Sequence, residues 1–260
     1  MLKKSLNILK SNPVMILLYA LFMVVTFLII FTLYPKDINQ FTNPDVTKFD
    51  FAGYLVMMGK MLIAALLMYA LGLLFYSGFG NMITEAVING KTSANSFLPG
   101  VKKYFVRVLL ASLLLMAFSI AFSIISSIIT VPIMLLSIRN VAITSLSIII
   151  TLILTLVIII ILPFILLWFP SIFIDDVGVI PGLVKGAKAG VKNYWKLLLV
   201  ILIIYLPVTA NIMINFKSIE NGNIFTPGYL IMGLLSVIMS LVSFPVFFLI
   251  YKENKPQQSI

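Results

Sequence analysis

Few side chains in this sequence could carry out acid–base or metal chemistry. The chain has no histidine and no cysteine, which removes the commonest general base, thiolate nucleophiles and the usual zinc ligands. Of its eight acidic residues, only Asp175 and Asp176 are adjacent. A hard divalent cation takes about six oxygen ligands, and two acids just before a helix are better suited to its positive N-terminus. We therefore predict no catalytic residues, no metal, no cofactor and no enzymatic activity.

Lysines in a regular pattern are the second feature of interest. Lys185, Lys188, Lys192 and Lys196 recur at the spacing of one helix face. Apolar residues supply the other side: Leu183, Val184, Ala187, Val191, Tyr194 and Trp195. Such a helix is expected to lie at a membrane surface with its lysines among lipid phosphates. The same lysines could instead serve only to set topology and anchor the chain.

A second basic and aromatic stretch, Gly100 to Phe105, contains two further lysines. Together the two stretches give the predicted contacts with anionic lipid headgroups: Lys102, Lys103, Lys185, Lys188, Lys192, Lys196, Tyr194 and Trp195. The net charge of +10 does not indicate a nucleic-acid partner, because the basic residues flank apolar segments and form no separate basic domain. Membrane lipids are the expected partner, and a protein partner or a second copy of the chain stays open.

The elements that must position these residues are expected to be transmembrane helices. The 260 residues are 62% hydrophobic and only 10% charged, far from the composition of soluble domains. Apolar runs long enough to cross a bilayer cover residues 13–34, 53–79, 106–135, 146–169, 197–216 and 229–251. The first run is too long for a signal peptide and lacks a small-residue cleavage site. The predicted fold is an all-α, polytopic transmembrane bundle of about six helices in a single domain, 1–260.

Orientation follows from the positions of Lys and Arg, which are in excess in cytoplasmic loops. With the N-terminus inside, the outer segments hold only Lys36, Lys48, Arg139 and Lys217, and most other basic residues fall in inner segments. We expect a multi-pass protein of the cell membrane with both termini in the cytoplasm. The abundance of Ile, Asn and Lys resembles proteins from AT-rich bacterial genomes.

An internal repeat is suggested by a shift of 90 residues. The shift pairs Gly100 to Phe105 with Gly190 to Trp195, and it places Glu85 over Asp175. The expected plan is three hairpins, at about 1–80, 81–170 and 171–260, each opening with a basic, aromatic segment on the cytoplasmic side. Repeats of this kind are common in transporters, and they are also a simple way to build any bundle.

The fifth apolar run is the most polar one. It contains Pro207, Thr209, Asn211 and Asn215, and a proline within a membrane helix can open a cavity if neighbours satisfy the freed carbonyl. If a small solute binds this protein, Pro207, Asn211 and Asn215 are the predicted site. The alternative function is accordingly a permease or transporter subunit.

A short cytoplasmic motif carries a family resemblance. It consists of an acidic pair, Gly-Val-Ile, small and basic residues, and Asn-Tyr-Trp entering a helix, here Asp175 to Leu197. With six spans, this resembles bacterial membrane proteins that include the membrane domain fused to some glycerophosphodiester phosphodiesterases. These 260 residues contain no catalytic barrel, so the resemblance implies no catalytic residue. The expected function is a non-enzymatic membrane scaffold or partner subunit that contacts anionic lipids.

Overall fold

The computed structural model describes residues 1–33, 51–137, 141–204 and 227–254. Every regular element within these ranges is a helix, which confirms the all-α fold class. The loop at 34–50 and the predicted solute site at Pro207, Asn211 and Asn215 lie outside the described residues.

Two helices form the N-terminal part. The helix α1, Leu2–Ser11, is followed at once by α2, Pro13–Leu33, and Asn12 separates them. Proline is well suited to the first position of a helix because its missing N–H would have no partner there. The Asn12 side-chain amide donates to the Ile8 carbonyl, 2.8 Å away, which satisfies one of the free carbonyls at the end of α1.

The next two helices are longer than the apolar runs that predict them. The helix α4 spans Phe51–Asn89, a single 3-10 turn covers Ala94–Ser96, and α5 spans Phe97–Ser137. The predicted end of the second span at residue 79 is therefore not the end of its helix. Hydropathy marks the lipid-facing part, whereas the helix continues beyond it, where Met82, Ile83 and Ala86 are buried in the core. The left-handed Gly90, with φ of 79°, follows the end of α4.

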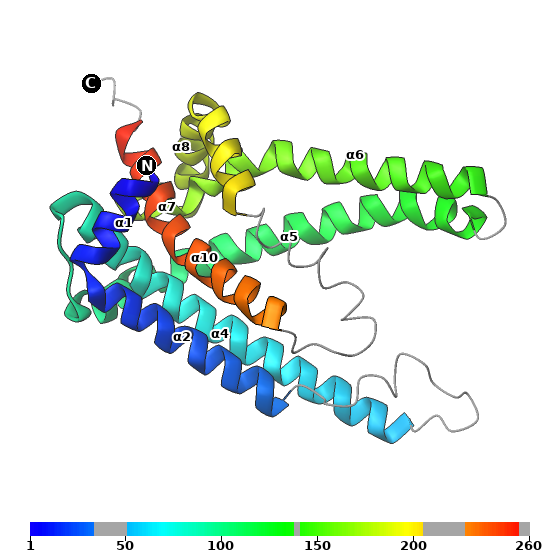
Figure 1. Ribbon diagram of the computed structural model, residues 1–260, viewed down its shortest axis with the longest axis horizontal. Helices are drawn as coiled ribbons and strands as arrows, with labels where there is room; N and C mark the ends of the chain where they lie inside the picture. The colour runs from blue at the N-terminus through cyan, green and yellow to red at the C-terminus, as the bar shows by residue number, and fades with distance from the viewer. Residues whose placement is uncertain (34–50, 138–140, 205–226, 255–260) are drawn as a thin grey trace.

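The remaining described elements are α6 at Val141–Leu166, α7 at Trp168–Ile174, α8 at Val179–Lys192, a helix at Tyr194–Ile204 and α10 at Pro227–Glu253. Figure 1 shows α2 beside α4 and α5 beside α6, with α10 running between these pairs. The helices α1, α7 and α8 gather at one end, together with the last turns of α4 and α10.

The packed core lies toward this same end. Tyr19, Phe75, Phe79 and Phe244 pack ring against ring, and Trp168 is fully buried. Toward the other end, large apolar side chains of α2, the first half of α4, α5 and α6 are exposed. A soluble protein rarely exposes such an extended apolar surface, so these faces are suited to contact with lipid.

Five helices within the described ranges are long and apolar enough to cross a membrane. Their membrane-length segments are Pro13–Leu33, Phe51–Asn89, Ala94–Pro132, Leu156–Ile174 and Gly233–Glu253. They agree with five of the predicted runs. Of the predicted fifth span, 197–216, only the part within Tyr194–Ile204 is described.

The two segments that the predicted repeat pairs have different structures. Gly100 to Phe105 lies inside α5, whereas Gly190 to Trp195 crosses the end of α8 and the turn at Asn193. Their close contacts also differ, because Gly100 lies against Asn81 and Gly190 lies against Pro163. The repeat stays a prediction from sequence.

Candidate functional site

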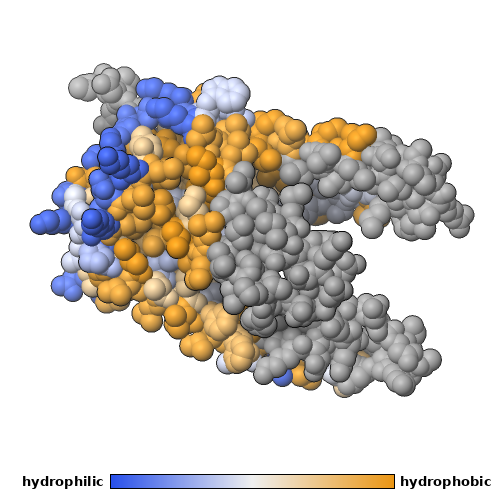
Figure 2. Space-filling view, in the orientation of Figure 1, coloured by the Kyte–Doolittle hydropathy of each residue, from blue (hydrophilic) through white to orange (hydrophobic). Residues whose placement is uncertain are grey.

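Basic side chains from distant parts of the sequence gather at the end that carries α1, α7 and α8, which we call the basic end. Figure 2 shows hydrophilic residues concentrated there and hydrophobic ones over the adjoining surface. The basic residues of α1, of the turn and first part of α5 that follow α4, of α8 and the start of the next helix, and of the end of α10 are Lys3, Lys4, Lys10, Lys91, Lys102, Lys103, Arg107, Lys185, Lys188, Lys192, Lys196 and Lys252. The predicted lipid contacts are thus brought to one end of the molecule.

The first and last described helices are both tied into the basic end. Lys4 of α1 pairs with Glu253 of α10 at 2.9 Å, and Ser5 donates to the Val242 carbonyl at 2.7 Å. Lys252 donates to the Val87 carbonyl near the end of α4, also at 2.9 Å. The beginning of α1 and the ends of α4 and α10 therefore lie on the same side of the bundle.

Asp175 connects three helices. Its side chain is only 3% exposed, and its Oδ2 accepts bonds from the Lys185 ammonium at 3.0 Å and the Tyr251 hydroxyl at 2.8 Å. These bonds join the end of α7 to α8 and to α10. Lys185, which the sequence suggests as a headgroup contact, therefore has a structural partner inside the protein.

Asp176 makes a second set of ion pairs, closer to the surface. Its carboxylate lies 2.8 Å from Lys103 Nζ and 2.6 Å from an Arg107 guanidinium nitrogen. The hydrogen bond from Lys103, with a further one from Arg107, holds the pKa of Asp176 below its ordinary value. Both cations also lie over the Tyr104 ring, at 5.0 and 5.5 Å from its centroid.

The acidic pair lies just before α8, as the sequence predicts, but neither carboxylate caps the helix with a hydrogen bond. The residue that precedes α8 is Gly178, and no side chain caps the helix. Asp176 has a positive φ of 52°, an uncommon conformation for a residue other than glycine that Asp and Asn adopt more readily than most. The turn at Asp176 directs the two carboxylates to different partners, and both act through ion pairs.

A row of glycines allows α8 to pack closely against α6 and α7. Gly182, Gly186 and Gly190 recur every four residues and are buried. A Cβ on Gly186 would lie 2.7 Å from the Trp168 backbone, and one on Gly190 would lie 2.5 Å from the Pro163 carbonyl oxygen. Only glycine permits this approach. The three glycines form a packing face between the lysine face and the apolar face, which the prediction from sequence did not include. The four-residue spacing was the available signal.

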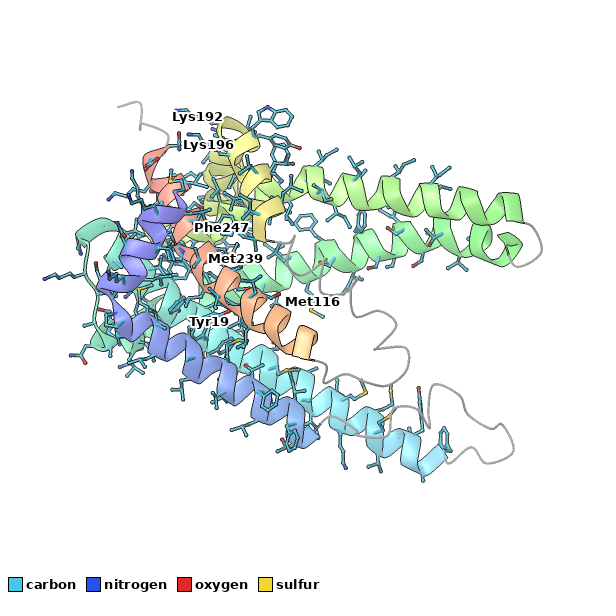
Figure 3. The ribbon with its side chains drawn as sticks, viewed as in Figure 1. Tyr19, Met116, Lys192, Lys196, Met239 and Phe247 are labelled. Atoms are coloured by element: carbon cyan, nitrogen blue, oxygen red, sulfur yellow. The ribbon has the colours of Figure 1, made fainter. Side chains whose placement is uncertain are left out.

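The predicted apolar side of α8 is divided: Leu183 is partly buried against the core, whereas other residues of this side face away from the protein. Val184 is 48% exposed, Val191 60% and Trp195, beyond the turn at Asn193, 77%. Lys188, Lys192 and Lys196 are exposed as well, and Figure 3 shows Lys192 and Lys196 at the outer edge of the bundle. The lysine face is interrupted at Asn193, so Lys196 belongs to the following helix. The Tyr194 ring is partly covered by Phe164, with centroids 5.9 Å apart.

The turn between α4 and α5 is held by a polar network that the sequence analysis did not foresee. Glu85 accepts hydrogen bonds from Thr92, at 3.1 Å, and from the Ser96 hydroxyl. The Asn12 side-chain oxygen accepts from the Thr92 backbone N–H at 2.7 Å. This network fixes the start of α5, where Lys102 and Lys103 extend from the protein, with both side chains exposed.

A model of a protein family matches residues 1–252, which is nearly the whole chain. The family is described as DUF7847, a domain of unknown function. The chain belongs to the DUF7847 family. Neither a curated protein nor a solved structure matches it. The resemblance to the glycerophosphodiester phosphodiesterase membrane domain stays a prediction.

In this DUF7847 member, the described acids form ion pairs and hydrogen bonds with their neighbours. Among the residues that the structure describes, no group of three or more acids, histidines or cysteines comes together in a way that could hold a metal ion. The arrangement at the basic end therefore offers cations, exposed apolar side chains and aromatic rings. These groups can bind an amphiphilic anion.

Proposed function

We propose that this protein is a non-enzymatic, multi-pass protein of the cell membrane whose basic end contacts anionic lipid headgroups in the cytoplasmic leaflet. The main observation that supports this proposal is the arrangement of α8. Its glycine face packs on the protein, Val184 and Val191 of its apolar face are exposed, and exposed Lys188 and Lys192 lie beside them. A helix with adjoining exposed apolar and basic faces is suited to the boundary between acyl chains and phosphates.

The proposed topology has six crossings, arranged as three hairpins. Five candidate spans are described, and the sixth would be the run at 197–216. An even number is supported by the ion pair between Lys4 and Glu253, which brings the first and last described helices together at one end. A bundle whose chain enters and leaves at the same end crosses an even number of times.

The cytoplasmic orientation is proposed from charge. The excess of Lys and Arg in inner segments determines orientation in most membrane proteins, and here the basic segments gather at the end that holds both α1 and the end of α10. The negatively charged cytoplasmic leaflet attracts such residues by about 1 kcal/mol for each Lys or Arg near the surface.

The test compares lysines on one helix. In Lys188→Gln/Lys192→Gln, association with phosphatidylglycerol should weaken about fivefold per lysine, as expected from about 1 kcal/mol each. Association with phosphatidylcholine should not change. The measurement is the fraction of motionally restricted spin-labelled lipid around the reconstituted protein.

Lys185→Gln is the control, compared with the double variant per lysine replaced, because it removes one positive charge from α8 at a lysine that is bonded to Asp175. It should leave lipid selectivity nearly intact. Unchanged phosphatidylglycerol association in the double variant, or an equal loss in the control, would overturn the proposal.

A further inference from the structure

A recess with apolar walls lies between α5 and the start of α8. Leu110, Leu113 and Leu114 of α5 line it together with Val179 and Ile180 of α8, and its volume is about 390 Å³. Leu110 and Ile180 are 48% and 57% exposed. The recess is therefore an open, apolar groove on the surface of the bundle.

The ion pairs of Asp176 with Lys103 and Arg107 lie next to the groove along the chain, because Arg107 precedes Leu110 on α5 by three residues and Asp176 precedes Val179 by three. Lys103, Arg107, Leu110 and Leu114 follow one another at i, i+4, i+7 and i+11, so they share one face of α5. Along this face the side chains change from cationic to apolar. Arg107 and Leu114 are seven residues apart in sequence, which corresponds to about 10 Å along the helix. A phospholipid has the same order, with a phosphate followed by acyl chains.

The charges of these ion pairs favour an anion. Two cations, Lys103 and Arg107, face one carboxylate, Asp176, so the cluster keeps one net positive charge. Lys103 and Arg107 side chains are 50% and 32% exposed, which leaves donors accessible from outside. Arg and Lys are the usual partners of phosphate, and the Arg fork can donate two parallel hydrogen bonds to it.

We propose that this groove binds one anionic phospholipid, whose phosphate lies on Lys103 and Arg107 and whose acyl chain lies along Leu110, Leu114 and Ile180. The site rests on the proposed function and deepens it, because it names one defined lipid position separate from the lysine face of α8. Asp176 competes with the phosphate for the same two cations. When the lipid binds, the cations turn from the carboxylate toward the phosphate.

This competition separates a lipid site from a purely structural ion pair. Arg107→Gln removes a phosphate ligand, whereas Asp176→Asn removes the competitor. The two substitutions therefore have opposite effects on lipid affinity, although both break the same ion pair. Asn is the suitable replacement because it tolerates the left-handed backbone of Asp176.

Trp168 provides a reporter for the groove. Its indole N–H donates to the carbonyl of Val179, a groove residue, at 2.8 Å. Trp195 is the second of the chain's two tryptophans, so Trp195→Phe leaves Trp168 as the single tryptophan. Phosphatidylglycerol with brominated acyl chains is added to the full chain in detergent, and quenching of Trp168 is followed to saturation, with brominated phosphatidylcholine in parallel.

We expect saturable quenching by phosphatidylglycerol at lower concentration than by phosphatidylcholine. Arg107→Gln should raise the apparent Kd for phosphatidylglycerol by about three- to tenfold, and Asp176→Asn should lower it. Equal weakening by both variants, no effect of Arg107→Gln, or equal affinity for the two lipids would overturn the site.

Lys188→Gln/Lys192→Gln distinguishes this site from the broader proposal. Quenching of Trp168 should persist in that variant if the groove binds its own lipid. If Arg107→Gln has no effect while the α8 variant loses lipid association, the groove is refuted and the proposed function stands. A melting temperature measured for each variant separates lost binding from lost folding, because a folded Arg107→Gln protein with unchanged quenching still counts against the groove.

Discussion

Asp175 and Asp176 are neighbours in sequence, yet they hold different parts of the basic end together. Asp175 is buried between Lys185 and Tyr251, and Asp176 is about half exposed beside Lys103 and Arg107. The sequence showed that these acids were unusual, because no other pair is adjacent. Their partners could not be predicted, since they lie on α5, α8 and α10 and depend on how those helices pack.

The difference in burial predicts different effects on stability. Asp175→Asn removes the charge that faces Lys185 and weakens a buried network, so it should lower the free energy of unfolding by about 1–3 kcal/mol. Asp176→Asn acts on an exposed pair and should cost less than about 1 kcal/mol. Thermal unfolding in detergent measures both. Similar melting temperatures for the two variants would contradict the assigned burial.

The lowered pKa of Asp176 predicts a pH dependence. A carboxyl with a lower pKa in the folded state stabilises fully above its unfolded pKa, near 3.8, and this stabilisation is lost as the pH falls through the folded value. The difference in melting temperature between the parent and Asp176→Asn should be constant from pH 7 to about pH 5. It should decrease as the pH falls below about 4, because Asp176 then becomes protonated. A difference that closes at higher pH would argue against the pairing with Lys103 and Arg107.

At the level of elements, the apolar runs correctly predicted where helices occur, but they predicted the ends of some helices poorly. The predicted spans at 13–34 and 229–251 differ little from α2 and α10. The helices α4 and α5 extend well past the apolar runs into the basic end, because polar residues there continue the helix once they are packed. The lysine spacing correctly predicted a helix at α8, but it could not show that glycines form the packing face.

The glycine face of α8 can be tested with one methyl group. Gly186→Ala places its Cβ 2.7 Å from the Trp168 backbone, which cannot move aside as a flexible side chain could. We expect a loss of about 1–3 kcal/mol in the free energy of unfolding. Gly59→Ala in α4 is the matched control because nothing lies within 4 Å of its Cβ. The control should be neutral or stabilising by up to about 1 kcal/mol.

Thermal unfolding of the two alanine variants gives the comparison. A Gly186→Ala protein that melts at or above the temperature of Gly59→Ala would mean that α8 is not seated on α7 as described. Retained stability with altered protease sensitivity near Val179 would also contradict close packing, because it would indicate that α8 detaches without affecting the bundle.

For the whole molecule, the positions of the basic residues in the sequence were the most informative feature, because they predicted which segments lie on the same side of the membrane. The sequence predicts Lys102, Lys103, Lys188, Lys192 and Lys196 on one side of the membrane, and in the structure the elements that carry them meet at one end. It could not predict that Lys4 meets Glu253 or that Asn12 meets Thr92, since hydropathy and periodicity contain no information about which helices pair. The predicted solute site at Pro207, Asn211 and Asn215 lies outside the described residues.

The topology is the central claim, because lipid contact in the cytoplasmic leaflet requires that the basic end face the cytoplasm. The chain has no cysteine, so single cysteines can be introduced at Asn43, Lys188 and Asn221 and labelled in intact cells with a membrane-impermeant maleimide. Lys188→Cys replaces an exposed lysine of α8, and Asn43 and Asn221 lie outside the described residues. We predict labelling at Asn43→Cys and Asn221→Cys and none at Lys188→Cys until the cells are opened. Labelling of Lys188→Cys in intact cells, with protection of the other two positions, would contradict the orientation and the function built on it.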